Sequence, residues 1–302
     1  MLKDTDIFSR EITYFEKNSA QMICTDLYQK LSFPKEFPAF IQVHRKNTVK
    51  FVPVHWHAGT ELIYVRSQMH RVIIEGQNYM VHPGEFILVN SNDLHSVVPS
   101  YLDEPQDGLG ITFNMSYLEK MWPNLRECRI DGHGPHATED SRKKMIEYCE
   151  LIREQTAELK EKRENYFSIN QTLFAILHLM YTDFLVDTGN IATKYTASRN
   201  KMMEILSYIQ ENYKENLTTQ TVASHWGYSR EYFCRIFKRY TSQTFKEYLM
   251  ELRLEESVKQ LQHSKQTIAQ IAFDNGFPDE KSFYQIFKQR YNITPSKFRK
   301  NS

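Results

Sequence analysis

The second half of the chain contains the same unit twice. Val222–Gly227 matches Ile271–Gly276 at an offset of 49 residues, and Phe233–Lys238 matches Phe283–Lys288 at an offset of 50. When a pattern recurs at a fixed spacing, each copy is expected to fold as one supersecondary unit. The repeat therefore limits this half of the chain to two related modules in tandem.

Each copy is predicted to form a short helix, a tight turn and a second helix. Thr267 and Gln270 have the spacing of a capping box, which starts a helix. Gly276 supplies the positive φ that a sharp turn requires. The first copy carries Gly227 for its turn and Ser229 as a cap for its second helix. Both copies thus have the signals of a helix-turn-helix.

The second helix of each copy has one apolar face and one basic, polar face. In a helix-turn-helix protein such a helix enters the major groove of DNA, which is about 12 Å wide. The alternative is an all-α bundle in which the Phe residues only form a core. Because turn, cap and polar face match in both copies, we favour DNA binding.

Charge is divided unevenly along the chain. The formal net charge is +1, but residues 198–302 hold 17 Lys and Arg against 11 Asp and Glu, a net charge of +6. The rest holds 21 against 26, a net charge of −5. A basic domain is typical of a phosphate-binding surface, although a solvated basic face has the same composition.

Residues 198–299 resemble the DNA-binding domain of the AraC/XylS family of transcription regulators. The match includes the joining helix that starts at Phe245 and the ending Phe-Lys-x-x-Tyr-x-Ile-Thr-Pro-Ser-x-Phe-Arg299. The resemblance implies two recognition helices in successive major grooves, about one helical turn apart. It implies DNA contacts from Arg230, Glu231, Cys234, Arg235 and Lys238 in the first helix, and from Glu280, Lys281, Tyr284, Gln285 and Lys288 in the second.

These residues have different expected roles. Arg235 is the best candidate for a bidentate contact with guanine. Lys238 and Lys288 are better placed for phosphates, which position a protein without reading sequence. Gln285 stands where the family often has Arg, which indicates adenine recognition or weaker binding in the second groove. Two further departures are Ser242 and Asn292, where the family carries Gly.

Short β-patterned runs fill residues 40–115 of the acidic half. They are Phe40–His44, Glu61–Val65, Arg71–Glu75, Phe86–Val89 and Leu109–Phe113. Turn signals follow at Glu75–Asn78 and His82–Glu85. Several short strands at this spacing predict a barrel or double-sheet jelly roll, whose mouth can hold a small molecule.

Four side chains of metal-ligand type fall in this region: His55, His57, Glu61 and His95. They resemble in part the cupin pattern, in which three His and one Glu hold a divalent metal ion. Gln68 stands where the first cupin motif ends in Gly, and the spacing to His95 is longer than in metal-dependent cupins. The set also resembles the sensor domain of AraC-type regulators, where these positions line an effector pocket. A sugar-like ligand bound without metal and a purely structural role stay open.

Ser141–Lys160 and Tyr166–Val186 are predicted as helices. Their apolar stripes are Met145, Tyr148, Cys149, Ile152 and Leu159 in the first, and Ile169, Leu173, Ile176, Leu177, Met180 and Phe184 in the second. Such stripes need a partner. The family resemblance implies that these helices pair two sensor domains in a homodimer, and packing against the barrel is the alternative. Residues 188–200 are small and polar and are predicted to form a linker.

The predicted fold is α+β with two domains. A cupin-like effector-binding and dimerisation domain spans 1–187, with its barrel at about 36–115 and its helices at about 140–187, and an all-α DNA-binding domain spans 201–302, with helix-turn-helix motifs at about 218–239 and 267–290.

The predicted function is transcription regulation rather than catalysis. We expect an activator of carbohydrate or small-metabolite genes that binds double-stranded DNA, a sugar-like effector and RNA polymerase. The alternatives are a metal-dependent cupin enzyme fused to a DNA-binding tail and a constitutive architectural DNA binder. No stretch approaches the roughly 20 apolar residues of a membrane span. The amino terminus lacks the pattern of a signal peptide, so we expect a cytoplasmic protein.

Overall fold

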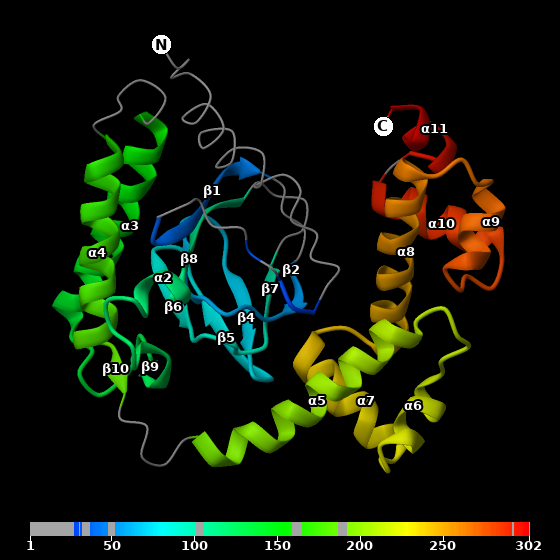
Figure 1. Cartoon of the computed structure of the whole chain (residues 1–302), viewed down its shortest axis with the longest axis horizontal. Coiled ribbons are helices and arrows are strands. Elements are labelled where there is room, and N and C mark those ends of the chain that lie inside the picture. Colours follow the sequence, from blue (N-terminus) through cyan, green and yellow to red (C-terminus); the bar gives the residue numbers. More distant parts are fainter. Residues whose placement is uncertain are drawn as a thin grey trace. The chain divides into compact units, whose positions relative to one another are not determined.

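The computed structural model describes residues 27–29, 31, 37–47, 52–100, 106–158, 165–186, 192–291 and 293–301. The chain divides into two compact units. The main segment of the first ends at Tyr195, and that of the second begins at Thr196. The first unit holds the strands and the second holds the two helix-turn-helix motifs (Figure 1). Among the described helices, none combines the length and apolarity that crossing a membrane requires.

Two four-stranded antiparallel sheets form the barrel of the first unit. The first sheet has the order β1-β8-β3-β6 and the second β2-β7-β4-β5. The strands are β1 (Ala39–Asn47), β2 (Val52–His55), β3 (Thr60–Val65), β4 (His70–Ile74), β5 (Gln77–Val81), β6 (Glu85–Val89), β7 (His95–Pro99) and β8 (Gln106–Phe113). This arrangement confirms the expected β-rich domain with two sheets.

The five predicted runs correspond to β1, β3, β4, β6 and β8, whereas β2, β5 and β7 were not predicted as strands. The β4–β5 hairpin turns at Glu75 and Gly76, whose φ angles are 51° and 74°. Two successive positive φ angles give the tight turn that matches the twist of the strands. Glu75 adopts this strained conformation while its carboxylate accepts a hydrogen bond from Leu94 N at 2.7 Å.

The first sheet separates an apolar core from the inside of the barrel. Ile41, Leu62 and Ile111 point outward and pack with α3 (Glu139–Glu158) and α4 (Asn165–Thr182). Their neighbours Gln42 and Glu61 line a cavity inside the barrel. Because successive residues of a strand face opposite sides, the same strands supply both the core and the pocket.

The stripes of α3 and α4 are buried within the chain, so in-chain packing accounts for them. Their members Met145, Cys149, Ile152, Ile169, Leu173, Ile176, Leu177, Met180 and Phe184 belong to the core shared with the barrel, and Tyr148 packs at its edge. Leu159 lies outside the described residues. These stripes therefore leave no large apolar surface for a partner subunit. A small strand pair, β9 (Arg129–Ile130) with β10 (Leu185–Val186), and two short helices, α2 (Met115–Leu118) and η1 (Leu125–Glu127), complete the unit.

The second unit is all-helical, as predicted. Its helices are α5 (Ala192–Asn212), α6 (Thr219–His225), α7 (Arg230–Thr241), α8 (Phe245–His263), α9 (Ile268–Asp274), α10 (Glu280–Tyr291) and α11 (Pro295–Asn301). The pairs α6–α7 and α9–α10 are the two helix-turn-helix motifs, and α8 joins them (Figure 1).

Local signals position these motifs largely as predicted. Gly227 and Gly276 have φ angles of 68° and 79° at the two turns. Ser229 accepts a hydrogen bond from a backbone N–H of α7. Thr267 caps α9 by accepting from Gln270 N at 3.1 Å, but the capping box is only half formed, because Gln270 does not accept from Thr267 N in return; its side-chain amide donates to Asp274 at 2.8 Å.

Part of the segment predicted as a linker is helical. Helix α5 begins at Ala192, inside the segment predicted as a linker. That segment lacks Gly and Pro after Gly189, so nothing in it stops a helix that is amphipathic further along.

Ser242 adopts the left-handed conformation, with φ 64°, at a position where the family carries Gly. Asn292 lies outside the described residues.

Candidate DNA-binding surface and barrel pocket

Helix α7 buries one face and exposes the residues predicted to contact DNA. Phe233 and Phe237 are fully buried and fix the helix against the rest of the unit. The exposed residues are Arg230, Glu231, Cys234, Arg235 and Lys238. The Arg235 guanidinium lies 5.4 Å from the centre of the Tyr232 ring, which restricts the conformations of the arginine.

Helix α10 presents a similar but less basic face. Phe283 and Phe287 are fully buried, and Glu280, Lys281, Gln285 and Lys288 are exposed. Tyr284 is half-buried, and its hydroxyl lies 3.1 Å from Ser296 Oγ. A base contact by Tyr284 would therefore use the ring edge or exchange this hydrogen bond.

A buried arginine connects α8 with the end of α5. Arg253, only 5% exposed, donates from Nε to Tyr213 O and from Nη2 to Glu215 O, both at 2.7 Å. Helix α5 also packs on the first motif, since the Tyr208 ring stacks on His225 at 4.7 Å. Arg253 thus links the joining helix to a segment fixed on the first motif.

The turn of the second motif packs against the same segment. Gly276 lies so close to it that a Cβ atom would be 2.7 Å from Lys214 O. The fully buried Asn275 donates to Gln260 Oε1 at 2.9 Å and accepts from Tyr213 Oη at 3.3 Å. We call Tyr213, Arg253, Asn275 and Gly276 the polar lock. These contacts join the turn of the second motif to the segment that follows α5, and we expect them to hold the two motifs in one orientation.

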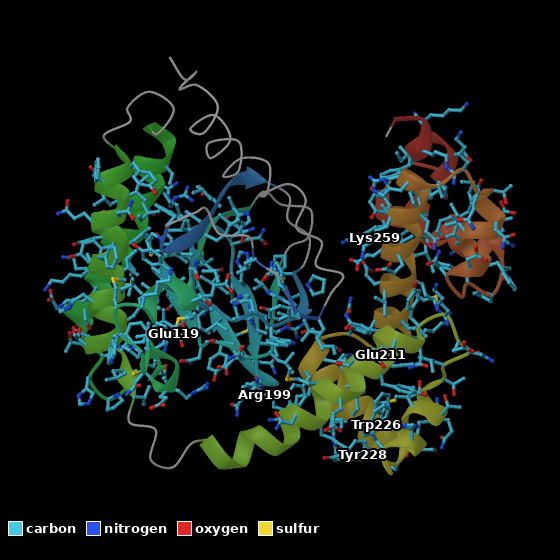
Figure 2. The ribbon with its side chains drawn as sticks, viewed as in Figure 1. Glu119, Arg199, Glu211, Trp226, Tyr228 and Lys259 are labelled. Atoms are coloured by element: carbon cyan, nitrogen blue, oxygen red, sulfur yellow. The ribbon has the colours of Figure 1, made fainter. Side chains whose placement is uncertain are left out.

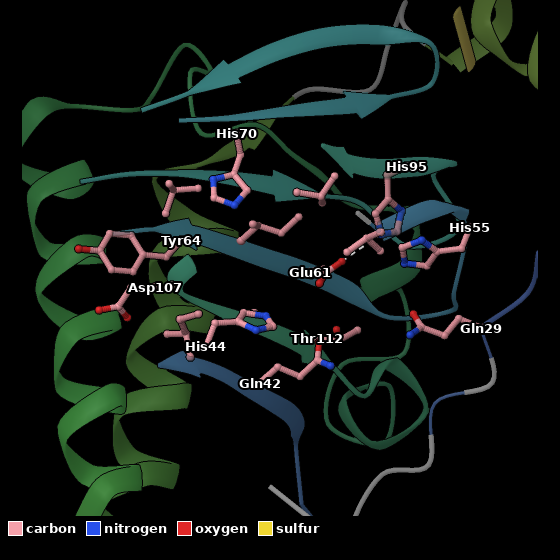
Figure 3. A pocket seen from close by; sticks show the side chains of 17 residues that line it. Gln29, Gln42, His44, His55, Glu61, Tyr64, His70, His95, Asp107 and Thr112 are labelled. Carbon is pink, nitrogen blue, oxygen red and sulfur yellow. Dashed lines mark ion pairs between the residues drawn. The ribbon is translucent and has the colours of Figure 1, made fainter. Parts of the chain in front are cut away.

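The barrel encloses a cavity of about 110 Å³ between its sheets (Figure 3). Its polar lining includes Gln42 and His44 from β1, Glu61 from β3, His70 from β4 and His95 from β7. Its remaining wall is largely apolar and includes Ile63, Val65 and Val97. An enclosed, largely apolar cavity with a few converging polar groups is typical of a small-molecule site.

The structure brings together all four predicted ligand-type residues. One donor atom from each of His55, His57, Glu61 and His95 lies within 4.8 Å of the others. Glu61 Oε2 is 3.2 Å from His57 Nε2 and 3.0 Å from His95 Nε2. The three imidazoles are 4% exposed or less, so this group, the histidine cluster, is shielded from solvent.

Backbone carbonyls orient the three imidazoles. The Nδ1 atoms of His55, His57 and His95 donate to Pro53 O, Gly59 O and Asp93 O at 2.8, 3.0 and 2.8 Å. A carbonyl oxygen only accepts, so each Nδ1 carries a proton, and in a neutral ring Nε2 has a lone pair. Three lone pairs and one carboxylate then face one another. Four acceptors packed this closely require a metal cation or extra protons between them.

The charges within the histidine cluster are strongly coupled. Burial acts to raise the pKa of Glu61, but the rings of His57 and His95 lower it overall. Burial lowers the pKa of His55 well below its ordinary value, and the neighbouring His95 adds to this effect. Burial also acts to lower the pKa of His95, yet the Glu61 carboxylate raises it overall. The cluster is thus organised around one buried negative charge.

The opposite end of the cavity adjoins a network of charges. Arg153 of α3 donates to Gly108 O at 2.6 Å and pairs with Asp107. Asp107 also pairs with Arg66 at 3.0 Å, and Arg66 reaches Glu150 at 3.0 Å. The network joins the strand residues Asp107 and Gly108, which line the cavity, to helix α3.

Of the polar lock, the sequence patterns singled out only Gly276, as a turn residue; they did not single out its other members or the far end of the cavity. Arg253 and Asn275 act through contacts with segments 15 to 62 residues away in the chain. His44 and His70 are single polar residues on strands, and only the folded sheets bring them to one cavity. The alternation along β1 was the one available signal for an inward His44.

Comparisons with known proteins match both units. The model described as an AraC-like ligand binding domain matches residues 37–167, and the one described as a helix-turn-helix domain matches residues 222–301. The transcriptional activator RhaS of Mannheimia succiniciproducens is 24% identical over 268 residues, which are 88% of this chain and 95% of that protein. The regulator YdeC of Bacillus subtilis is 23% identical over 268 residues, 84% of this chain and 88% of that protein.

A shorter relative matches the second unit alone. The probable transcription factor PqrA of Proteus vulgaris is 36% identical over 106 residues, which are 34% of this chain and 87% of that protein. These relatives are DNA-binding transcription regulators rather than enzymes. With two helix-turn-helix motifs and a matching ligand-binding domain, the chain belongs to the AraC/XylS family of transcription regulators.

Proposed function

We propose that this regulator binds DNA through both recognition helices and responds to an effector that enters the barrel cavity. The observation that carries the proposal is the presence, in one chain, of a shielded cavity with a few converging polar groups and of two capped motifs with exposed polar faces. The ten residues named above on α7 and α10 make the DNA contacts. The histidine cluster, His55, His57, Glu61 and His95, forms one end of the effector site.

We further propose that the protein activates genes for the use of a carbohydrate or another small metabolite. Support comes from relatives of similar length, among them RhaS proteins that are named transcriptional activators. An activator of this kind acts in the cytoplasm and contacts RNA polymerase at its promoters. Deleting the gene should then lower the transcripts next to the bound sites, and a rise would indicate repression.

The histidine cluster has the chemistry of a site for a divalent metal ion. Imidazole nitrogens together with a carboxylate suit transition metals such as Fe, Mn, Ni or Zn. The hydrogen bonds from each Nδ1 to a carbonyl orient the rings, as the outer partners of metal-binding histidines do. We propose that His55, His57, Glu61 and His95 hold such an ion. When bound, it supplies a Lewis-acidic point to which oxygen atoms of the effector can attach.

Metal analysis of the purified full chain tests this proposal. We expect about one divalent ion per chain, lost in His57→Ala and retained in the control His82→Ala, whose exposed histidine lies in a surface turn. Removing the ion with a chelator should lower the melting temperature of the parent and not that of His57→Ala. A metal-free parent that takes up none of the four ions would show that protons, not a metal, neutralise the cluster.

We propose that α3 and α4 also form a homodimer contact. This contact uses exposed apolar side chains that do not belong to the buried stripes. Phe167 and Phe174 on α4 are 79% and 40% exposed, and Leu151 on α3 is 39% exposed. Phe167 and Phe174 are seven residues apart, so they share one face of the helix. A group of exposed apolar side chains of this kind favours association with a second copy of the chain.

Light scattering of the full chain measures this contact. The double change Phe167→Glu and Phe174→Glu should weaken self-association at least about tenfold, because it places two charges in the contact. Met121→Glu is the control, since Met121 is also exposed, at 56%, but lies outside α3 and α4. Equal self-association of all three proteins would exclude this face as the dimer contact.

A further inference from the structure

We infer that the end of the barrel cavity formed by His44, His70 and Gln42 is a second ligand subsite, which binds an uncharged hydroxyl group of the effector. The inference rests on the proposed role of the cavity as the effector site. It adds a second contact point, away from the histidine cluster, and limits the chemical class of the ligand: a small molecule whose group at this end of the cavity is an uncharged hydroxyl.

The two imidazoles come from different sheets and face the same space. His44 extends from β1 and His70 from β4, and Figure 3 shows them on opposite sides of the cavity. Glu61 and His95 of the histidine cluster lie further along the same cavity. Apolar side chains, among them Ile63 and Val97, line the rest of its wall. A ligand that fills the cavity therefore meets polar groups at two places.

One atom of this end lacks the partner that a buried polar atom needs. His44 Nδ1 is buried and has no hydrogen-bond partner among the described residues. Buried polar atoms almost always have a partner, because burial removes their hydrogen bonds with water. The cavity beside His44 offers the space for one. An unsatisfied nitrogen on a cavity wall is what a binding site presents before its ligand arrives.

The surroundings of His44 favour an uncharged partner. Burial lowers the pKa of His44, and the nearby His70 and Arg153 lower it further. A neutral imidazole has one N–H and one lone pair, so a hydroxyl group can pair with either nitrogen, whereas a carboxylate can only accept from the N–H. Burying a carboxylate without a cation is also costly.

The nearby cation is already engaged by the protein. Arg153, 7% exposed, directs its guanidinium at Gly108 O and Asp107 and approaches His44 O at 3.4 Å. Asp107 in turn is shared with Arg66. This end of the cavity therefore offers an acid no free positive charge from these residues. The subsite selects a hydroxyl group.

Gly110 provides a means to fill the cavity without changing its polar groups. A Cβ atom at Gly110 would lie 3.6 Å from both Gln42 Oε1 and Glu61 Oε1, which is ordinary contact. Alanine therefore fits here, and its methyl group occupies space between the two polar ends. Gly110→Ala should weaken binding of a ligand that spans the cavity and leave a metal ion at the histidine cluster in place.

Calorimetric binding to the full chain tests the subsite with two matched probe series. One series consists of erythritol, xylitol and arabinose, and the other of the corresponding aldaric acids, which carry a carboxylate at each end. We expect at least one uncharged probe to bind saturably and its acid to bind at least about tenfold more weakly. His44→Leu should lower the affinity for the uncharged probe about tenfold or more. His44→Asn, which keeps a polar group near the position of Nδ1, should recover part of it, and His82→Leu should have no effect.

A second measurement does not depend on finding the ligand. Since Leu removes an unsatisfied buried nitrogen, His44→Leu should raise the melting temperature of the ligand-free protein. A lower melting temperature would make His44 a structural residue and overturn the subsite, as would tighter binding of the acids or no binding by either series. If a probe binds equally to the parent and to His44→Leu, the subsite is wrong and the effector cavity stands. The effector cavity itself fails if the bound probe is unaffected by both Gly110→Ala and His57→Ala.

Discussion

A protein in which Met replaces Arg253 is expected to bind a DNA site of two blocks about 100-fold more weakly than the parent, and to bind each block alone with unchanged affinity. Two linked modules gain affinity because binding of the first raises the effective concentration of the second, by a factor of about 10²–10⁴ when the geometry fits. The polar lock provides that geometry. Without it the gain should be largely lost.

The reason lies in what Arg253 holds. Its guanidinium satisfies the carbonyls of Tyr213 and Glu215, next to the place where Gly276 packs on Lys214. Met fills a similar volume but donates no hydrogen bond, so two carbonyls lose their partner, at a cost of about 1–3 kcal/mol each. We expect the two motifs to stay folded, because their own Phe cores are intact, and to lose their fixed orientation.

The measurement is binding of the full chain to DNA in which the distance between the blocks varies. The parent should prefer one spacing steeply, and Arg253→Met should bind all spacings with similar, low affinity. Lys259→Met is the matched control: Lys259 lies on the same helix, is exposed and forms a surface ion pair with Glu256 at 2.7 Å (Figure 2). Equal losses on single blocks and on paired blocks would mean that Arg253 supports folding rather than orientation.

The second large effect is expected on α7. Arg235→Ala should remove discrimination at one base pair of the first block, worth about 1–3 kcal/mol or about 5- to 150-fold in affinity. Arg235 is exposed in the middle of the helix and lies beside Tyr232, so its guanidinium is already restricted. Binding to sites that are mismatched at this position should change little.

Lys238 supplies the comparison for Arg235. It is exposed one turn further along α7, in the last turn of the helix. A phosphate contact carries no sequence information, so Lys238→Ala should weaken binding to matched and mismatched sites alike. It should also reduce the slope of log affinity against log salt by about one. If both substitutions act equally on all sites, Arg235 does not contact a base.

The sequence predicted the helix-turn-helix units well because their signals are local. A turn glycine such as Gly276, a cap such as Ser229 and a stripe such as Phe283 with Phe287 act within a few residues of one another. Because the turn, cap and stripe signals all favour the same local structure, that structure is also found in the folded protein. Local signals did not predict every bond. The capping box expected at Thr267 forms only in part, and the side chain of Gln270 bonds to Asp274 one turn further along the helix.

The missed features depend on contacts between distant segments. The stripes of α3 and α4 indicated a partner, but only the fold decides whether that partner is the barrel or a second chain. Strand β5 is short and mostly exposed, so it has no apolar alternation to detect. The lock residue Arg253 and the subsite residue His44 have no local pattern, because each acts on a group that the chain brings near only when folded.

The central claim is that two recognition helices, held by the polar lock, read two stretches of one DNA duplex. Selection of bound sequences from random DNA by the full-length protein tests it most directly. We predict two conserved blocks whose centres are about 10–10.5 base pairs apart, one helical turn, with the spacing fixed. A single conserved block, two blocks at variable spacing, or no enriched sequence would contradict the claim.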